Sequence, residues 1–424
     1  MSEPDLDLVV FGATSVTGRR VAAYLAERTA GTELRWAAAA RDLVKLERTL
    51  GESGIEAPEV IAADVDDRQS LEAMAARTRV VVNLVGPYTR FGTPVIEACV
   101  GAGADYVDLT GELPFVRRTI DAFDRRAREA EVKLVQVCGF EALPADLGVL
   151  LAAEAAAQRW GERLAEVELE FVVMATPPGM PRASDLFSGG TIQSMAEITG
   201  DPDAARITDP ALLVDDPAAA AAIRERSPIQ VRPRRGTGGS VIAPMSPAAF
   251  INPAVIHRTA TLVAAESGAR FEPFRYREGM AIGGPGPTLP LRLFAAGALS
   301  GVQASMAAAA RSNPAVRERL SGVMRRRLPG SGFGPAADRL EDWRWGISIA
   351  ARTDGGHELG VEIDAEGHPG YLATARMLGE AGLALADREN TPDRAGCLTP
   401  ATAIGTAGIE RFERAKLRFA LNPA

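Results

Sequence analysis

The residues with the clearest chemical promise are the seven of the turn Gly12-Ala13-Thr14-Ser15-Val16-Thr17-Gly18, which follow an apolar run and precede a helical pattern. Gly12 allows a sharp turn after a buried strand, and the small residues after it let backbone N–H groups approach a pyrophosphate at a helix N-terminus. Gly18 keeps that helix close to the sheet. Ser15 stands where a glycine of the dinucleotide fingerprint is expected, so the spacing is G-x-x-S-x-x-G. We predict that this turn binds a nucleotide, and an ordinary Gly-rich turn is the alternative.

Residues after the next strands extend this interpretation. Arg41 follows the second predicted strand, where an acidic residue would bind a ribose 2′-hydroxyl and an arginine would bind a 2′-phosphate. It favours NADP(H) and leaves NAD(H) open, although a solvated arginine at a helix start is the alternative. Asp64 is placed either to accept from the adenine amino group or to cap the next helix. Four residues at the end of the fourth predicted strand are expected near the nicotinamide ribose: Asn83, Val85, Gly86 and Pro87.

Three side chains that follow predicted strands are candidates for the chemistry itself. Tyr88 is the leading candidate for proton transfer or substrate orientation, and a ring packed at a turn is its alternative. Glu112 is a second candidate, unless it caps the helix that starts at Leu113. Cys138 is a third candidate, but it is more typical of a core or cofactor-packing residue, since no histidine is near it in sequence.

A glycine-rich segment further along the chain offers hydroxyl groups. Ser184, Ser188 and Thr191 lie in or beside the letters SGGT, and such a segment could close over a substrate. The alternative is an ordinary helix cap.

Alternating apolar strands and amphipathic helices position these residues. The predicted strands are 6–11, 34–40, 59–63, 80–85, 106–109 and 133–137. The predicted helices between them are 17–28, 43–50, 68–77, 94–102 and 113–130. This order predicts an α/β fold with a doubly wound parallel Rossmann sheet, whose carboxyl edge carries the nucleotide.

The pattern changes after the Ala-rich helix that follows Pro144. Strand-like segments at 165–175, 343–352 and 360–364 lie among Pro/Gly-rich stretches. We therefore expect an NADP-binding domain at 1–150 and a substrate-binding α+β domain at 151–370. The remaining segment, 371–424, is expected to form helices at 371–386 and 407–421 that pack back on the first domain.

Composition narrows the classes of function. The net charge of −8 argues against nucleic-acid binding, and the 46% hydrophobic and 24% charged content is typical of a globular protein. His257, His357 and His368 lack metal-ligand spacing, so no metal is predicted. Three widely separated cysteines and an acidic start without an apolar signal core indicate a cytoplasmic protein.

Two further features bear on partners. Residues 293–310 are apolar but diluted by small and polar residues, which favours a packed helix or one near a lipid substrate or membrane surface over a membrane span. The arginine clusters at 232–235 and 325–327 are most simply explained as solvated surface residues. The sharper hypothesis is that one cluster receives the phosphate of a carrier-bound acyl thioester or an acidic acyl-carrier domain of a polyketide synthase. A homo-oligomer is compatible with the sequence.

Taken together, these blocks resemble the saccharopine dehydrogenase-like oxidoreductases, and among them the trans-acting enoyl reductase branch. The resemblance spans almost the whole chain in the blocks VVFGATSVTG, NLVGPYTRFGTPVIEACV, YVDLTGE, CGFEALPADLG, SGGTIQSM, PGYLATARMLGEA and LTPATAIG. It implies a Rossmann domain, a second α+β domain before C-terminal helices and nicotinamide-dependent reduction. Ser15 in place of the commoner glycine and Glu141 where an aspartate is usual depart from the family pattern.

The expected activity is NADP(H)-dependent reduction of the carbon–carbon double bond of an enoyl thioester in lipid or polyketide biosynthesis. Hydride would reach the β-carbon, the thioester carbonyl would absorb the developing charge, and a proton would reach the α-carbon. Two alternatives stay open. One is saccharopine dehydrogenase-like reduction of an imine or carbonyl in an amino-acid-like substrate, which needs cationic contacts to carboxylates. The other is a non-catalytic nucleotide-binding scaffold with lipid or protein contacts.

Overall fold

Two seven-stranded sheets organise the protein in the computed structural model, which describes residues 4–57, 59–179, 189–236, 240–244, 248–268, 270–282, 288–327 and 333–423. The first sheet is parallel throughout and has the order β13-β6-β5-β4-β1-β2-β3. Its strands are β1 (Leu6–Phe11), β2 (Trp36–Ala40), β3 (Glu59–Ala62), β4 (Thr78–Asn83), β5 (Asp105–Asp108), β6 (Lys133–Val135) and β13 (Gly396–Leu398). The strand order reverses direction next to β1, which places a ligand crevice at the carboxyl end of that strand.

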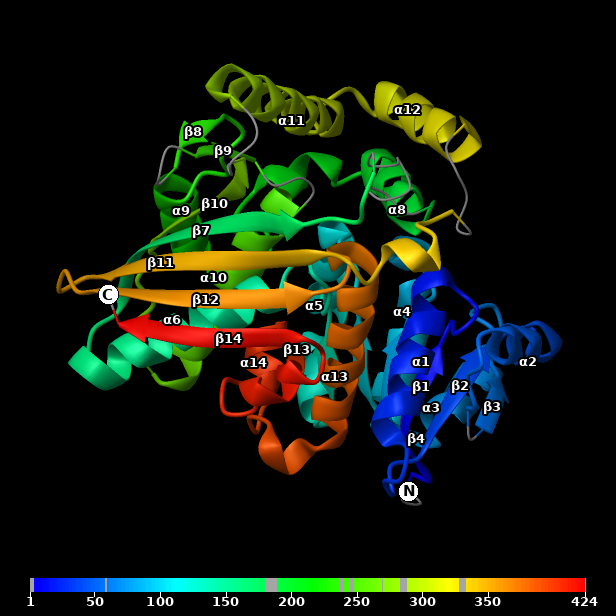
Figure 1. Ribbon diagram of the computed structural model, residues 1–424. Helices are drawn as coiled ribbons and strands as arrows, with labels where there is room; N and C mark the ends of the chain where they lie inside the picture. The colour runs from blue at the N-terminus through cyan, green and yellow to red at the C-terminus, as the bar shows by residue number, and fades with distance from the viewer. Residues whose placement is uncertain are drawn as a thin grey trace.

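Helices cover both faces of this sheet, which confirms the doubly wound arrangement. They are α1 (Val16–Thr29), α2 (Leu43–Glu52), α3 (Arg68–Ala75), α4 (Tyr88–Ala102), α5 (Leu113–Glu129) and α13 (Thr374–Ala386). The β1 side chains Leu8 and Val10 face the core under α1 and α13, whereas Val9 and Phe11 face the core under α3, α4 and α5. This alternation is why the strands are apolar at consecutive positions. Figure 1 shows α13 beside α1 on one side of the sheet.

The second sheet is mixed and has the order β14-β12-β11-β7-β10-β9-β8. Its strands are β7 (Leu164–Ala175), β8 (Arg234–Arg235), β9 (Val241–Ala243), β10 (Arg275–Ile282), β11 (Arg344–Thr353), β12 (Glu358–Glu366) and β14 (Leu417–Pro423). The long strands β7, β11, β12 and β14 lie side by side in Figure 1. Helix α6 (Leu143–Trp160) packs on this sheet, with α10 (Asn252–Glu266) against α6.

The remaining helices pack at several places. They are α8 (Gly189–Gly200), α9 (Pro217–Arg226), α11 (Leu289–Ala310), α12 (Pro314–Arg327) and the short α14 (Pro400–Ile404). Helix α9 packs against β10, and α14 packs against α6, α10 and α13. Short segments lie between helices and strands along the chain: η1 (Ala204–Thr208), η3 (Ala248–Phe250), η4 (Ala337–Arg339), η5 (Pro369–Ala373), η6 (Arg388–Asn390) and η7 (Ile409–Glu413). Helix α12 packs on α8, while α11 lies across η1 and β9, and the two helices form the uppermost layer in Figure 1.

The C-terminal segment differs from the expected pair of helices. Helix α13 confirms the first of them, but the predicted helix 407–421 is wrong: the structure has η7 and then strand β14. Leu417, Phe419 and Leu421 alternate with polar or small residues, which is the period of a half-buried strand. Strand β14 pairs with β12. The end of the chain therefore joins the second sheet, while β13 just before it joins the first.

Several predicted boundaries also move. Strand β2 begins at Trp36 rather than residue 34, and β4 ends at Asn83 rather than residue 85. Helix α4 begins at Tyr88, six residues before the predicted start, and Pro94 lies inside it. Pro94 is the seventh residue of the helix, beyond the first-turn N–H groups that have no partner, so it leaves the carbonyl of residue 90 without its usual i→i−4 donor.

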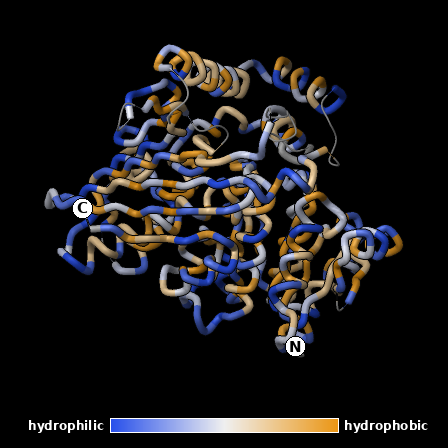
Figure 2. The backbone as a smooth tube through the Cα atoms, viewed as in Figure 1, coloured by the Kyte–Doolittle hydropathy of each residue, from blue (hydrophilic) through white to orange (hydrophobic). Residues whose placement is uncertain are grey.

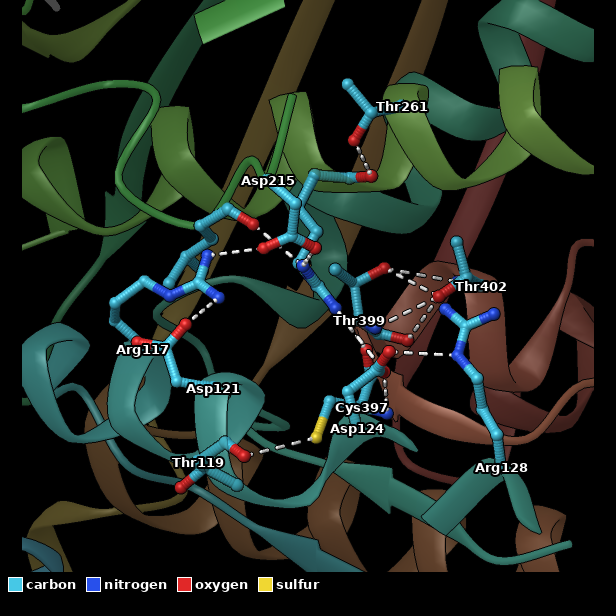
Figure 3. Close-up of polar contacts among 12 residues, drawn as sticks. Arg117, Thr119, Asp121, Asp124, Arg128, Asp215, Thr261, Cys397, Thr399 and Thr402 are labelled. Carbon is cyan, nitrogen blue, oxygen red and sulfur yellow. Dashed lines mark hydrogen bonds and ion pairs between the residues drawn. The ribbon is translucent and has the colours of Figure 1, made fainter. Parts of the chain in front are cut away.

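Contacts from helix α5 hold strand β13 at the edge of the first sheet. The backbone N–H of Cys397 donates to Asp124 Oδ1 at 2.8 Å, and the Cys397 thiol lies 3.7 Å from the carbonyl oxygen of Thr119 (Figure 3). On the same helix, Arg117 binds Asp121 and, at 2.8 Å, the carboxylate of Asp215 from the second half of the fold. These bonds explain how a three-residue strand so late in the sequence is fixed in the first sheet.

Candidate functional site

The turn after β1 has the geometry of a dinucleotide-binding loop. Gly12 adopts a φ of +90°, and a Cβ there would lie 2.9 Å from the Leu84 carbonyl carbon, so only glycine fits. A Cβ on Gly18 would lie 2.2 Å from the Gly12 carbonyl oxygen, so this glycine allows the helix to start close to the strand. Ser15 caps α1 by accepting from the Gly18 N–H at 2.9 Å. The serine that departs from the fingerprint thus stabilises the start of the helix that faces the nucleotide.

The structure brings Arg41 and Asp64 together at the ends of β2 and β3. The Arg41 side chain is 74% exposed, and its Nε lies 3.9 Å from Asp64 Oδ2, which is a weak contact at the surface. Arg41 is therefore available to an incoming 2′-phosphate. Asp64 accepts from the N–H of Asp66 and does not cap α3, because the cap residue is Asp67. The alternative interpretation of Asp64 as a helix cap is wrong.

Asn83 holds the next turn together and does not face the cavity. Its Oδ1 accepts from the Val85 N–H at 3.0 Å, and its Nδ2 donates to the hydroxyl of Tyr106 at 3.0 Å. Both ends of this buried amide are thereby occupied. Among the residues expected near the nicotinamide ribose, Gly86 and Pro87 line the cavity described below.

Tyr88 and Glu112 are joined at the start of α4. The backbone N–H groups of Tyr88 and Thr89 donate to the two Glu112 carboxylate oxygens at 3.0 and 2.7 Å. Glu112 thus satisfies the first amides of α4; it also occupies the N-cap position of α5, as the alternative interpretation has it, but its side chain makes no capping hydrogen bond there. The Tyr88 hydroxyl donates to the Asn83 carbonyl at 3.1 Å. Burial, with Asp108 and Glu112 nearby, raises the pKa of Tyr88 well above its usual value.

Cys138 lies in the core behind this edge of the sheet. It is fully buried, and its backbone N–H donates to the Asp108 carbonyl at 2.8 Å. Burial raises the pKa of the thiol well above its ordinary value, so the reactive thiolate is disfavoured. This environment is that of a packing residue.

A cavity of about 190 Å³ lies at the end of the nucleotide turn. Its walls come from the turn, from the loops after β4 and β5, from helix α8 and from Gly370. The described lining residues are Ser15, Val16, Thr17, Leu84, Gly86, Pro87, Tyr88, Leu109, Gly111, Glu141, Gln193, Ser194, Met195, Ile198, Ile251 and Gly370. No arginine, lysine or histidine is among them. A ligand held here beside a nicotinamide ring meets mostly apolar surface.

Glu141 is the candidate site residue that we did not predict. It lines the cavity, and its enclosed Oε2 has no hydrogen-bond partner among the described residues. Burial raises the pKa of this carboxyl from 4.5 to about 7. A Cβ on Gly139 would lie 2.4 Å from that oxygen, so the glycine makes room for the carboxylate. The signal for Glu141 in the sequence is the acidic residue of the block CGFEALPADLG, which departs from the aspartate usual in the family.

Helix α8 brings the glycine-rich segment to the cavity. Gln193, Ser194 and Met195 line it, and the Ser194 hydroxyl donates to Glu112 at 2.7 Å. Ser184 and Ser188 lie outside the described residues, as does the side chain of Thr191.

Three other points from the sequence can be compared with the structure. Helix α11 is the one described helix that is long and apolar enough, by length and composition, to cross a membrane. The described residues contain no group of three or more side chains that could hold a metal ion. Of the arginine clusters, Arg234 binds Glu168 in the second sheet at 2.9 Å, and Arg325 on α12 lies 3.4 Å from Glu197 on α8.

Comparisons with known proteins identify the nucleotide-binding domain and the family of the chain. The family model of the saccharopine dehydrogenase NADP binding domain matches residues 8–135. The fold resembles apo saccharopine dehydrogenase from Saccharomyces cerevisiae, with a TM-score of 0.52 at 12% identity, covering 98% of this chain and 99% of that one. The family model identifies NADP(H) as the preferred cofactor of this oxidoreductase, and the contact of Arg41 with its 2′-phosphate stays a prediction.

Similarity to two curated relatives extends over the whole chain. A Mycobacterium tuberculosis protein named provisionally as a trans-acting enoyl reductase is 35% identical, covering 97% of this chain and 96% of the relative. A Mycobacterium ulcerans protein named trans-acting enoyl reductase is 31% identical with the same coverage of both chains. The chain therefore belongs to the trans-acting enoyl reductase family of saccharopine dehydrogenase-like oxidoreductases.

Proposed function

We propose that this protein uses NADPH to reduce the carbon–carbon double bond of an enoyl thioester in lipid or polyketide biosynthesis. The observation that carries the proposal is the character of the cavity beside the nucleotide turn. Its described lining is largely apolar, contains no basic side chain and offers one carboxyl group with a pKa of about 7. An amino-acid-like substrate with carboxylates needs cationic partners, whereas an acyl thioester does not. The names of the relatives point the same way.

The chain's own groups divide the work of such a reduction. The turn from Gly12 to Gly18 presents amides to the diphosphate, and Arg41 binds the 2′-phosphate. NADPH, when bound, supplies the hydride that the β-carbon of the substrate accepts. Protonated Glu141 donates the proton that the α-carbon requires, for which a pKa near the working pH is suited. The Gln193 amide, which also lines the cavity, donates to the thioester oxygen as negative charge develops there.

The three side chains first proposed as catalytic take other roles in this scheme. Tyr88 orients the substrate with its ring, because its hydroxyl is bound to the Asn83 carbonyl. Glu112 is a positioning residue that fixes the start of α4. Cys138 packs behind the site.

The proposed substrate is delivered on a carrier. Arg325 to Arg327 end helix α12, which packs on the cavity-lining helix α8, so this cluster is better placed than residues 232–235 to receive an acidic acyl-carrier domain. Contact with a lipid surface stays a prediction. In its favour, Leu291, Leu293 and Phe294 of α11 are 55%, 52% and 74% exposed, and Figure 2 shows this apolar helix at the outside of the molecule.

NADPH oxidation by the purified protein tests the proposal. Activity is expected with 2-enoyl thioesters and not with imino acids or 2-oxo acids paired with an amino acid, with the saturated thioester identified by mass spectrometry. Turnover of the amino-acid-like substrates alone would overturn it. Tight NADPH binding without turnover of any thioester, free or carrier-bound, would favour the scaffold alternative instead.

A further inference from the structure

A second, larger cavity lies under the two outermost helices. Its volume is about 550 Å³, within the range of roughly 300–1,000 Å³ that small-molecule sites occupy. Helices α11 and α12 form its roof, and α8, the residues around η3 and the start of α5 form its floor. Side chains such as Leu113, Ile198, Phe250, Val302 and Met324 line it.

The described lining of this cavity offers no charged group and no free side-chain N–H or O–H donor. Two of its side chains carry hydroxyls, Thr199 and Ser305, and each donates to a carbonyl of its own helix at 2.7 Å. A ligand group that accepts hydrogen bonds, such as a carboxylate, would lose its bonds to water here without replacement from a side chain. A hydrocarbon would lose none, so the cavity selects for apolar ligands.

The two cavities share walls. Gly111, Met195, Ile198 and Ile251 line both this cavity and the smaller one beside the nucleotide turn. A ligand whose reactive end lies at Glu141 therefore has an apolar space directly next to it. The shared residues come from both parts of the fold. Gly111 follows β5 of the first sheet, whereas Met195, Ile198 and Ile251 lie in the segment that carries the second sheet.

We propose that the cavity under α11 and α12 binds the hydrocarbon tail of the acyl substrate and sets the chain length that the enzyme accepts. This inference rests on the proposed function for the reduction of the double bond at the thioester end of the substrate. Binding of the hydrocarbon tail in the cavity does not depend on that function. Each methylene that enters the cavity contributes about 0.8 kcal/mol, which is roughly a fourfold gain in kcat/KM until the cavity is full. Longer chains then gain nothing further.

Two glycines of α11 provide a matched pair of variants. Gly301 lines the cavity and is exposed, and a Cβ there would meet no atom within 4 Å, so Gly301→Leu adds an apolar side chain at the cavity wall without a clash. Gly297, about one turn earlier, also has open space around it but is not part of the lining, so Gly297→Leu is the control. Replacing glycine by leucine within a helix favours helix formation, so neither variant is expected to unfold the protein. Ser305→Leu is a second variant inside the cavity.

Binding of cis-parinaric acid, followed by its fluorescence, tests the cavity without any turnover. The unmodified protein and Gly297→Leu are expected to bind it equally, and Gly301→Leu and Ser305→Leu at least about tenfold more weakly, with NADPH binding unchanged in all four. With enoyl-CoA substrates from crotonyl-CoA to hexadecenoyl-CoA, the two cavity variants are expected to lose kcat/KM for long chains only.

The outcomes separate the two proposals. Binding of the fatty acid that Gly301→Leu weakens, without turnover of any thioester, would leave the cavity proposal standing and overturn the proposed reaction. Turnover with kcat/KM independent of chain length, and equal in Gly301→Leu and Gly297→Leu, would overturn the cavity proposal alone. Equal weakening by both leucine variants would also overturn it, because Gly297 lies outside the cavity.

Discussion

Glu112 accepts a hydrogen bond from Ser194 at 2.7 Å, and this contact joins the nucleotide-binding half of the fold to helix α8 across the candidate site. The same carboxylate holds the first two amides of α4. One buried side chain therefore fixes both the loop that carries Tyr88 and the helix that carries Gln193. It couples the placement of the cofactor side of the cavity to the placement of the substrate side.

Glu112→Ala is expected to destabilise the protein by more than Ser194→Ala. The alanine at 112 leaves two buried amides without partners, at about 1–3 kcal/mol each, whereas the Ser194 change removes a single hydrogen bond worth about 1–2 kcal/mol. Urea unfolding measures the difference. Ser194→Ala is expected to raise KM for the acyl substrate and, through Glu112, to weaken NADPH binding as well, and an unchanged NADPH affinity would contradict the coupling described here.

Arg41→Ser is expected to weaken NADPH binding and leave NADH binding unchanged. The guanidinium is exposed and only weakly engaged with Asp64, so its removal affects the 2′-phosphate contact rather than the fold. Loss of a charge-assisted hydrogen bond of about 1.5–3 kcal/mol corresponds to a roughly 10- to 150-fold weaker Kd for NADPH. Calorimetry with NADPH and with NADH measures the two dissociation constants. Arg48→Ser, an exposed change on helix α2, which begins two residues after Arg41, serves as the control and is expected to bind both nucleotides as the parent does.

Glu141→Gln is expected to lower kcat by about 10²- to 10⁴-fold, because the glutamine amide keeps the shape but cannot give up a proton at neutral pH. In the parent enzyme the carboxyl is protonated below its pKa of about 7, so kcat should fall as the pH rises through that value. The pH dependence of kcat under saturating substrate measures this. Glu141→Asp keeps the acid and should retain the decline, while a decline that persists in Glu141→Gln would show that another group supplies the proton.

The nucleotide turn could be predicted from the sequence because its determinants are local. Gly12, Ser15 and Gly18 lie within seven residues of one another and shape the strand end, the turn and the helix start there. The residue type at each position shows what the local backbone needs: a glycine at the turn, a capping serine, and a glycine where the helix approaches the strand. Asn83 shows the limit of that reasoning. The sequence correctly places Asn83 near the end of a strand. It does not show that the Asn83 side chain points inward to Tyr106, a partner 23 residues away.

Other parts of the site depend on contacts that no local pattern reveals. Strand β13 is three residues long, and its place beside β6 depends on contacts from α5 and from Arg258 of α10. Glu141 Oε2 lacks a hydrogen-bond partner among the described residues because of the way helix α8 and the loop after β6 pack around it. The sequence therefore shows the carboxyl group but not its surroundings. The end of the chain was misassigned as a helix although its alternation was visible, because the many charged residues of 407–418 also fit a helical surface.

Asp146→Asn is expected to make the free energy of unfolding less dependent on pH. Burial raises the pKa of Asp146 from 3.8 to about 7, so its contribution is greatest below pH about 4 and is lost as the pH rises to about 7. An asparagine can still accept from the Ala401 N–H and donate to the Thr259 hydroxyl, the two groups that the carboxylate now binds. Urea unfolding at several pH values between about 4 and 7 should show a slope reduced by at most about 1.4 kcal/mol per pH unit. An unchanged slope would contradict the raised pKa.

Charge reversal at the end of α12 is expected to separate carrier-bound from free substrates. Arg326 and Arg327 are exposed, whereas Arg325 already binds Glu197, so the double change to glutamate alters the surface without breaking that contact. An acidic carrier domain would then meet repulsion, and KM for the carrier-bound enoyl substrate should rise about tenfold at low salt and less at high salt. The N-acetylcysteamine thioester carries no such charge, so its KM should not change. Reversal of Arg232 and Arg235 is the matched control, and an effect confined to that pair would place the carrier at the other cluster.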